Sequence, residues 1–466
     1  MRLYQRVFTS EATNGLSMGL ADYKPTRHDH RTIWALAWPM ILSNITVPLV
    51  GLVDTAVIGH LSDSRHLGAV AVGSMFFSVI YWAFGFLRMG TSGLTAQAVG
   101  AQRPNQNRTL LAQSLVMGCV IGCALILFQY PLIEAALYWI EATPAVTDAA
   151  RTYTQTRIYS APAVLCNFAL LGWFVGNQNT RIPLILLITT NLLNMIMDVI
   201  AVYYFGLASQ GVALASVIAE YGSLALGLWF CRRLLARMGG ELLTSSLKHL
   251  SHYTELIKVN RYLFVRTLAI LFSLAFFTAQ GARQGTDILS ANAVLLNFVL
   301  IISNGLDGFA HATEAITGKR IGQRDLSGFY RNLIAAACWS LVTAVLFTIF
   351  FWSAGQHIIH LLTSIESVRA QATLYLPWLI ALPLLGVWSF LLDGLFIGAT
   401  QVKAMQNTML VSVFLVFLPV WWLSQPWGNH GLWFAFLSLF VARALTGGFV
   451  FWRLSRTGSW LSAMSH

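Results

Sequence analysis

Three stretches of this chain occur twice, in the same order along the sequence. GWFVGNQNTR (172–181) recurs as GLFIGATQVK (394–403), and TSGLTAQAVGAQ (91–102) recurs as TEAITGKRIGQR (313–324). In both pairs, the two copies are the same number of residues apart. A third pair, GVALA at 211 and GLWFA at 431, is two residues closer together along the sequence, as an insertion or deletion in a loop would make it. The chain therefore consists of two similar halves, and many membrane transporters are built from such repeats.

The composition places the chain in a membrane. Of its 466 residues, 56% are hydrophobic and only 10% are charged, and the mean hydropathy is +0.65. Soluble domains carry about 25% charged residues, so this chain cannot build a water-exposed surface. The net charge of +11 does not indicate a nucleic-acid partner, because the basic residues are spread between apolar segments. We expect an integral membrane protein that contacts lipid and no nucleic acid.

A membrane-spanning helix needs about 20 mostly apolar residues, and the sequence contains twelve such segments. They lie near residues 33–60, 67–95, 109–133, 151–176, 182–205, 211–231, 262–285, 290–317, 332–353, 371–398, 406–424 and 431–452. Helices are expected because of this length, and because open sheets leave backbone groups unsatisfied in lipid. The predicted fold class is an all-α integral membrane protein with twelve transmembrane helices.

The distribution of Lys and Arg predicts the orientation. If the N-terminus is cytoplasmic, the inner loops hold most basic residues, among them Arg103, Arg108, Arg181, Lys319, Arg320, Arg324, Arg331 and Lys403. The outer loops hold few, namely Arg65, Arg151, Arg283 and Arg369, and acidic residues accompany them. Cytoplasmic loops carry an excess of Lys and Arg, so both termini are expected on the cytoplasmic side.

A basic segment in the middle of the chain separates the two halves. The predicted order is a cytoplasmic extension without a signal peptide, an N-lobe of six spans, a cytoplasmic linker, a C-lobe of six spans and a cytoplasmic tail. Their bounds are 1–31, 32–231, 232–261, 262–453 and 454–466. Because six is even, both halves start on the same side of the membrane. Two six-helix bundles related by a pseudo-twofold axis along the membrane normal are therefore expected.

Ionisable residues inside the first-half spans are candidates for ion coupling, since a charge at membrane depth costs about 2.5–3.5 kcal/mol on insertion scales. Asp54 lies in LVDTAVIG and Asp198 in NLLNMIMDVI. Asn194 lies four residues before Asp198, and thus on the same helix face. An amide there can hydrogen-bond either form of the carboxyl group. Such a group can exchange a proton or hold a cation; the alternative is a buried Asp that only ties helices together.

The second-half spans contain three acidic residues. Asp393, in LLDGLFIG beside the repeated glycine motif, is the stronger candidate for a second site, and Asp307 is another. Glu314 lies near the inner end of its span, where water could reach it, so a structural and a functional role stay equally open. Arginines also lie in or near apolar runs, at Arg88, Arg266 and Arg443.

Other motifs set limits on the function. Pro39 lies in the same span as Asp54, and proline removes a helical hydrogen bond and bends a helix. No HExxH, CxxC or Walker sequence occurs, and no Ser/His/Asp spacing points to a nucleophile. We therefore expect neither an enzyme nor a bound cofactor or metal, apart from H⁺ or Na⁺ as a coupling ion.

The segment PMILSNITVPLVGLVDTAVIGHL (39–61) resembles the first helix of multidrug and toxic compound extrusion (MATE) transporters of the DinF-type branch. The segment 69–101 and the paired G-x-F-x-G motifs are similar to the same family. The resemblance covers about 33–453. It implies a twelve-helix antiporter in the bacterial cytoplasmic (inner) membrane, which exports bulky hydrophobic or cationic compounds against inward H⁺ or Na⁺.

The resemblance also assigns roles to residues. Asp54 matches the first-helix acid of proton-coupled members, Asn194 and Asp198 match their fifth-helix pair, and Pro39 matches the proline about which the first helix is proposed to bend. Asp393 resembles a tenth-helix acid assigned to cation binding in some Na⁺-coupled members. The seventh span (262–285) has no carboxylate where many relatives have a Glu. This difference favours H⁺ coupling in the first half, although an Asp54/Asp198 site could also hold Na⁺.

The leading hypothesis is an H⁺-coupled multidrug antiporter that works by alternating access as a monomer. Its substrates are small hydrophobic or cationic molecules, and the substrate-lining candidates are Phe76, Tyr81, Trp82 and Gln280. Aromatic faces attract organic cations, but such residues also commonly face lipid. The alternative is a lipid-linked saccharide flippase, for which Arg88 and Arg266 would supply a cationic cavity. A membrane-embedded enzyme would need a catalytic constellation that the sequence lacks.

Overall fold

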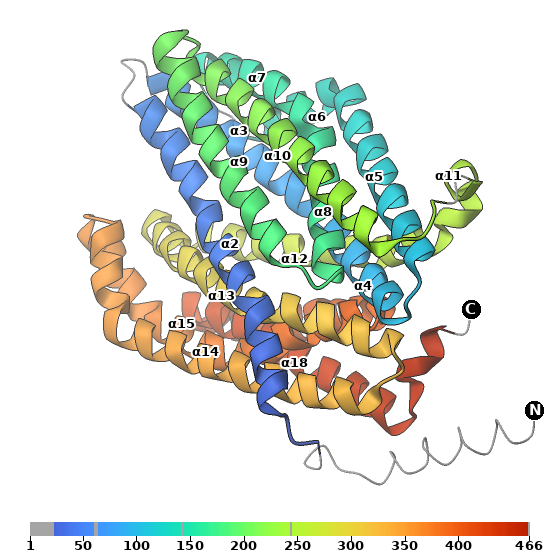
Figure 1. The fold of residues 1–466 in the computed structure, drawn as a ribbon. Helices are drawn as coiled ribbons and strands as arrows, with labels where there is room; N and C mark the ends of the chain where they lie inside the picture. Colours follow the sequence, from blue (N-terminus) through green and yellow to red (C-terminus); the bar gives the residue numbers. More distant parts are fainter. Residues whose placement is uncertain (1–22, 60–63, 141–142, 243–244, 465–466) are drawn as a thin grey trace, which may run out of the picture. The chain divides into compact units, whose positions relative to one another are not determined.

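The protein is described by a computed structural model over residues 23–59, 64–140, 143–242 and 245–464. Inside the first range, the side chains of residues 45–56 lie outside the description. The described ranges are almost entirely helical and contain no β-strand (Figure 1). This confirms the predicted all-α fold class.

The helices of the first half follow one another with short connections. They are α2 (Arg27–Gly59), α3 (Ser64–Ala83), α4 (Phe86–Gly100), α5 (Pro104–Leu127), α6 (Gln129–Ile140), α7 (Pro144–Arg157), α8 (Ala161–Gly176), α9 (Arg181–Val199) and α10 (Ala208–Met238). A 3₁₀ turn at Ile158–Ser160 joins α7 to α8, and a π-helical turn at Ile200–Tyr204 extends α9.

The second half contains three helices of 33–37 residues together with shorter ones. They are α11 (Ser245–Lys248), α12 (Thr254–Ala282), α13 (Thr286–Gly322), α14 (Leu326–Leu362), α15 (Glu366–Gly398), α16 (Val402–Val411), α17 (Leu418–Ser424) and α18 (Asn429–Arg456). A π-helical stretch, Ser412–Phe417, connects α16 to α17.

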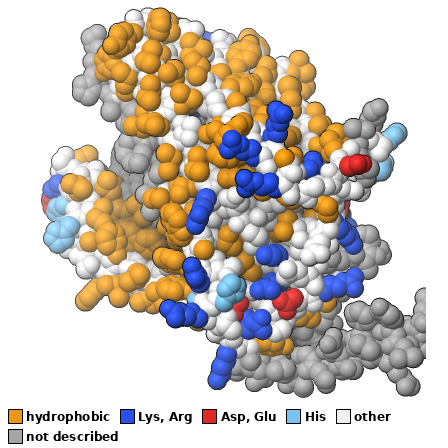
Figure 2. All heavy atoms as spheres, viewed as in Figure 1, with side chains coloured by type: hydrophobic (Ala, Val, Ile, Leu, Met, Phe, Trp, Pro, Cys, Tyr) orange, Lys and Arg blue, Asp and Glu red, His pale blue; other side chains and the backbone are white. Residues whose placement is uncertain are grey.

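Eleven helical stretches of the described residues are long and apolar enough to cross a membrane, and the predicted first span lies in α2. Their surfaces agree with contact to lipid. On α9, the exposed side chains include Ile185, Ile188, Leu192 and Ile196, which form one stripe at helical spacing. Figure 2 shows hydrophobic side chains over most of the visible surface where α7, α9 and α10 lie.

Several predicted spans are divided in the structure, among them the one at 109–133, where α5 ends at Leu127 and α6 begins at Gln129. The span predicted at 67–95 consists of α3 and α4, which are separated by a tight turn at residues 84–85. In this turn the amide of Gly85 donates to the carbonyl of Trp82 over 3.1 Å. The span predicted at 151–176 likewise consists of α7, the 3₁₀ turn and α8. Hydropathy reports the apolar length of a span but carries no information about such breaks.

The chain forms two compact units, and their bounds differ from those of the predicted lobes. We call residues 42–99 and 103–264 the N-unit, and residues 23–41, 100–102 and 265–464 the C-unit. The linker predicted at 232–261 thus packs with the first half rather than standing alone. The first half of α2 packs with the C-unit, where the Trp34 ring lies 5.8 Å from that of Phe309 and 5.1 Å from that of Trp339.

The start of α2 is fixed by a reciprocal cap. The backbone amide of Thr26 donates to Asp29 Oδ2 over 2.8 Å, and the amide of Asp29 donates to the Thr26 hydroxyl over 3.3 Å. This arrangement satisfies two amides that have no helical partner. Burial acts to raise the pKa of Asp29, but the Thr26 hydrogen bonds and the charges of Arg331 and Arg320 together hold that pKa below its usual value. Arg331 lies 3.6 Å from the carboxylate, which ties α2 to α14.

The internal repeat has the same geometry in both units. A Cβ added at Gly172 of α8 would lie 2.2 Å from the carbonyl oxygen of Arg88 on α4. A Cβ added at Gly394 of α15 would lie 2.2 Å from the carbonyl oxygen of Ala310 on α13. The offset from Arg88 to Ala310 equals the offset from Gly172 to Gly394. The repeated glycines are therefore the points where two helix backbones touch.

Rare backbone conformations repeat as well. Left-handed φ angles occur at Gln102 (53°) and Arg324 (59°), and at Gln178 (63°) and Thr400 (53°), and each pair is separated by the same offset as the repeated glycines. Ala208 (38°) is matched by Gly428 (57°) at the shorter offset of the third repeated stretch. Non-glycine residues seldom adopt positive φ, so this agreement confirms the duplicated architecture and places the change of offset between 400 and 428.

Substitution of a repeated contact glycine is expected to destabilise the protein. Gly172→Ala places a methyl group against a backbone carbonyl, which cannot move without separating α4 from α8, and we expect a loss of about 1–3 kcal/mol. Thermal unfolding of purified protein in detergent measures it. Gly448→Ala on α18 is the matched control, since nothing lies within 4 Å of its added Cβ. Equal unfolding temperatures for the two variants would contradict the close contact.

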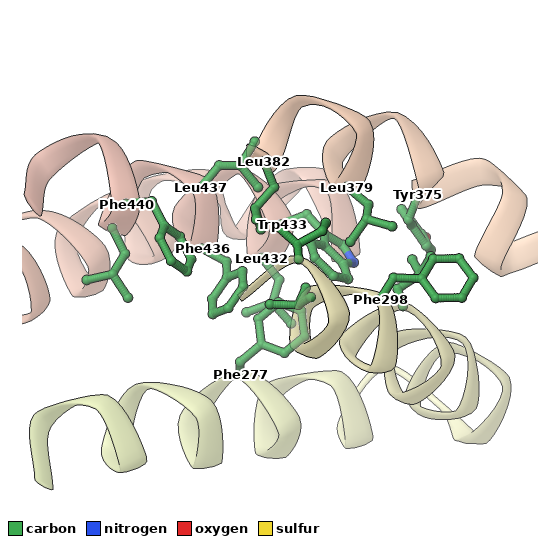
Figure 3. Packing of buried hydrophobic residues seen from close by; sticks show 14 of the residues in the cluster. Phe277, Phe298, Tyr375, Leu379, Leu382, Leu432, Trp433, Phe436, Leu437 and Phe440 are labelled. Carbon is green, nitrogen blue, oxygen red and sulfur yellow. The ribbon is translucent and has the colours of Figure 1, made fainter. Parts of the chain in front are cut away.

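The core of the C-unit is rich in aromatic residues, and most of its buried side chains come from α13, α15 and α18. Phe277 of α12, Trp433 and Phe436 of α18 and Leu379 of α15 are all at most 2% exposed. Figure 3 shows their side chains converging together with Phe440 and Phe298. The rings of Phe277 and Trp433 lie 4.9 Å apart in an edge-to-face arrangement, which is favourable for aromatic pairs.

Candidate functional site

The N-unit buries the acid and amide that the sequence predicts as an ion-coupling pair. Asp198 is 0% exposed and Asn194 is 3% exposed, and both lie on α9. The Asn194 amide donates to the hydroxyl of Ser216 on α10 over 3.3 Å. Asp198 comes shortly before the π-helical turn at Ile200–Tyr204, a distortion that frequently marks functional sites. Neutral polar groups therefore lie on the same face as a fully buried carboxyl group.

Two further residues of the predicted coupling mechanism, one acid and one proline, lie on α2. The side chain of Asp54 lies outside the described residues, so its meeting with Asp198 stays a prediction. Pro39 is buried, and α2 is one continuous helix through this position. The role of Pro39 as a point of bending likewise stays a prediction.

A second polar group of the N-unit was missed in the sequence. Glu220 lies on α10, four residues after Ser216, and Asn167 of α8 donates to its Oε2 over 2.9 Å and to its backbone carbonyl over 3.1 Å. Arg157, at the end of α7, donates to Ser74 over 3.3 Å and to the hydroxyl of Tyr153. Glu220 could have been identified from the sequence, because it is a lone carboxylate within the apolar run 211–231.

The predicted substrate-lining residues have different surroundings. Tyr81 lies in the polar part of the N-unit, with its hydroxyl 2.9 Å from that of Ser160. Phe76 packs against the hydrophobic cluster of Ala69, Ile133, Leu137 and Ala150. Trp82 is 47% exposed, and Gln280 is partly exposed on α12. Of these four, the structure brings Tyr81 near the polar groups of the N-unit.

The C-unit contains a buried cluster of charges that the sequence did not predict. Asp393 of α15 forms ion pairs with Arg443 of α18, over 2.5 Å, and with Arg266 of α12. Both guanidinium groups meet the same carboxylate oxygen, Oδ2, and their side chains are only 9% and 7% exposed. Asp307 of α13 also interacts electrostatically with Arg443. Three helices are thus joined through one carboxylate.

The charge cluster affects which acidic residues of the second half remain candidates for a cation site. Asp393 faces two cations at contact distance, so its charge is already compensated. The sequence left solvation of Glu314 open; in the structure it is only 1% exposed and lies 3.5 Å from the Nδ1 atom of His311, one turn earlier on α13. It is buried because α15 packs closely against α13 at this end of the helix, where a Cβ added at Gly398 would meet the carbonyl oxygen of Glu314. Within the described ranges, no group of three or more His, Cys, Asp or Glu side chains is arranged to hold a metal ion.

Comparisons with known proteins agree with this architecture. The MatE family model matches twice, at residues 39–200 and 262–423, once in each half. The chain is 42% identical over 436 residues to the DNA damage-inducible protein F of Escherichia coli (strain K12), covering 93% of this chain and 94% of that protein. It is 23% identical over 442 residues to the multidrug resistance protein NorM of Vibrio cholerae, covering 90% and 94%.

Solved structures show the same fold. An outward-facing multidrug resistance MATE family transporter of the MOP superfamily aligns with a TM-score of 0.81 at 16% identity, covering 92% of this chain and 96% of that one. The Vibrio cholerae MATE transporter VcmN aligns with a TM-score of 0.80 at 19% identity, covering 93% and 98%. The resemblance predicted from the first helix and the glycine motifs is therefore confirmed. The chain belongs to the MatE family and is an integral membrane transporter, not an enzyme.

Proposed function

We propose that this protein is a secondary multidrug antiporter that exports bulky hydrophobic or cationic compounds in exchange for inward H⁺, by alternating access. Asp198 carries the exchanged proton, and Asp54 shares that role. Protonation from the outer side neutralises the site, allows α2 to bend at Pro39 and weakens the hold on a cationic substrate. Release of the proton to the cytoplasm restores the negative charge that attracts the next substrate.

The observation that carries this proposal is the complete burial of Asp198 on a helix face that also presents neutral hydrogen-bonding groups. Burial disfavours an isolated carboxylate, whereas an amide or a hydroxyl can support either protonation state. The hydrogen bond between Asn194 and Ser216 joins two neutral groups, so it does not commit the site to one charge. The carboxyl group is thus suited to bind a proton in one conformation and to release it in another.

The acidic residue Asp393 of the C-unit is less suited to ion coupling than Asp198, which supports placing the coupling site in the N-unit. A carboxylate that already meets two guanidinium groups offers little to a sodium ion, since a cation would have to displace an arginine at contact distance. Asp393 therefore serves in stability, and we place coupling in the first half. The same cluster argues against a cationic cavity for a lipid-linked saccharide, because the two arginines, Arg266 and Arg443, interact with two carboxylates, Asp393 and Asp307.

We further propose that the protein resides in the bacterial inner membrane with both termini in the cytoplasm. The excess of Lys and Arg in the loops assigned to the inside supports this orientation. One chain holds both repeats, so a monomer suffices for transport. A multidrug substrate range is supported by the similarity of the chain to NorM, a multidrug resistance protein.

The function is tested by export of ethidium, a flat organic cation, from proteoliposomes that contain the purified protein. A pH gradient in sodium-free buffer is expected to drive ethidium accumulation on the acidic side, whereas a sodium gradient at equal pH is not. Accumulation that requires sodium would contradict proton coupling. Absence of ethidium transport under both gradients, with translocation of an anionic lipid-linked saccharide instead, would favour the flippase.

A further inference from the structure

Glu220 is a polar residue that the fold itself does not require. The third repeated stretch aligns α10 with α18 at the offset from Gly211 to Gly431, so Glu220 corresponds to Phe440 and Ser216 to Phe436. Those two rings belong to the aromatic core of the C-unit (Figure 3). The same helix position can therefore be filled by apolar packing, and the carboxylate of the N-unit needs another explanation.

The environment of Glu220 contains features that favour its ionised form and a feature that favours its neutral form. Asn167 donates a hydrogen bond to the carboxylate over 2.9 Å, and Arg157 of α7 interacts with it electrostatically; both favour the ionised form. Burial among apolar helices favours the neutral form. Arg157 also donates hydrogen bonds to Ser74 and to the hydroxyl of Tyr153, so Glu220 shares this cation with neutral groups. Asp393, in contrast, meets two guanidinium groups at contact distance.

Other titratable groups near Glu220 come from the helices packed around α10. Tyr81 of α3, whose hydroxyl is hydrogen-bonded to that of Ser160, interacts electrostatically with Glu220, and α8 contributes the neutral amide of Asn167. Asp198 is the carboxyl group of α9, and it lies further along that helix. Among the described residues of these helices, Arg157 is the permanent cation that interacts with Glu220.

A row of polar residues, which we call the polar path, lies between Glu220 and the buried pair on α9. Asn194 contacts Ser216 across the two helices at 3.3 Å. Ser216 and Glu220 are four residues apart, and so are Asn194 and Asp198, which is about 6 Å along each helix. Since α9 and α10 are consecutive and run in opposite directions side by side (Figure 1), Asp198 lies at one end of the path and Glu220 at the other. In the predicted orientation, the Glu220 end is nearer the cytoplasm.

We propose that Glu220 is a second proton-binding carboxyl group of the transport site, so that the N-unit exchanges two protons for each monovalent cation. This inference rests on the proposed function, because the bound cation competes with protons at Asp198. Each carboxylate takes a proton from the outer solution, and each gives it up to the cytoplasm when the cation binds.

The proton number is measured by the steady-state ethidium ratio across proteoliposomes, with the membrane potential held at zero by potassium and valinomycin. A pH gradient of one unit supports a ratio of about 100 with two protons and about 10 with one. We expect the higher ratio for wild type and the lower for Glu220→Gln. Glu134→Gln is the matched control, because this carboxylate on α6 pairs with Arg151 outside the site. It should keep the wild-type ratio.

A second measurement is used if the Glu220→Gln variant binds ethidium but does not transport it. Protons released on ethidium binding in detergent are counted with a pH indicator: two are expected for wild type and for Glu220→Asp, and one for Glu220→Gln. If the variant does not bind ethidium, infrared spectra are recorded in acidic and in alkaline buffer. The difference in intensity of the protonated-carboxyl band should be smaller than in wild type by the contribution of one carboxyl group.

The possible failures are distinguishable. An equal ethidium ratio, an equal proton count or an unchanged carboxyl band in Glu220→Gln would overturn the second proton site and leave the proposed function intact. If wild type accumulates no ethidium under a pH gradient, or if Asp198→Asn accumulates as much as wild type, the proposed function itself fails.

Discussion

Asp198→Asn is expected to abolish ethidium export driven by a pH gradient. Asparagine has nearly the same shape and keeps a hydrogen-bonding group on the face of Asn194, but it neither binds a proton nor carries the charge that attracts a cation. The steady-state ethidium ratio should fall from about 10 or more per pH unit to about 1. The measurement is ethidium fluorescence in proteoliposomes, at matched protein content.

Loss of folding must be separated from loss of coupling. Because the replaced carboxyl group is fully buried, the neutral amide should leave the unfolding temperature of Asp198→Asn unchanged or slightly raised. Asp148→Asn, which removes an exposed partner of Arg151, is the matched control and should export as wild type does. Export by Asp198→Asn at the wild-type ratio would show that the coupling proton is bound elsewhere.

Asp393→Asn is expected to destabilise the C-unit strongly while leaving the coupling mechanism intact. The substitution leaves the guanidinium groups of Arg266 and Arg443 buried without their shared carboxylate. Removal of one partner of a buried ion pair costs about 3–5 kcal/mol, and we expect the unfolding temperature in detergent to fall by on the order of 10 °C. At low temperature, the folded fraction should still export ethidium under a pH gradient.

Replacement of the whole cluster should be far less damaging than removal of its centre. Buried ion pairs exchanged for apolar residues of similar volume are often neutral or stabilising, and the repeat position equivalent to Asp393 is Leu171 in the N-unit. The triple variant Arg266→Met, Asp393→Leu, Arg443→Met should therefore recover most of the lost stability. A stable Asp393→Asn protein that has lost sodium-dependent export would instead identify a cation site in the C-unit.

The fold was predictable from sequence to the extent that lipid dictates it. A bilayer demands apolar helices of about 20 residues, so the spans could be found from hydropathy, and the glycine repeats revealed the duplication. The pair of Asn194 and Asp198 could be recognised because residues four apart share a helix face. Glu220 obeys the same rule as Asp198 and could have been found in the same way.

The remaining features depend on contacts between distant segments. Asp393 lies 127 residues from Arg266 and 50 from Arg443, and three intramembrane charges on separate helices carry no local signal of their pairing. The attachment of the first half of α2 to the C-unit was hidden for the same reason, since Trp34 meets Phe309 and Trp339 only in the folded chain. The turn that divides α3 from α4 lies within an uninterrupted apolar run.

The central claim is that transport of an organic cation is obligatorily linked to opposite movement of protons in the N-unit. It is tested most directly in reverse, by imposing an ethidium gradient on proteoliposomes in sodium-free buffer at equal pH and recording the internal pH. We predict that ethidium leaving the liposomes draws protons in, against their developing gradient, and that Asp198→Asn shows no such movement. Ethidium flux without proton movement, or proton movement that survives in Asp198→Asn, would contradict the account.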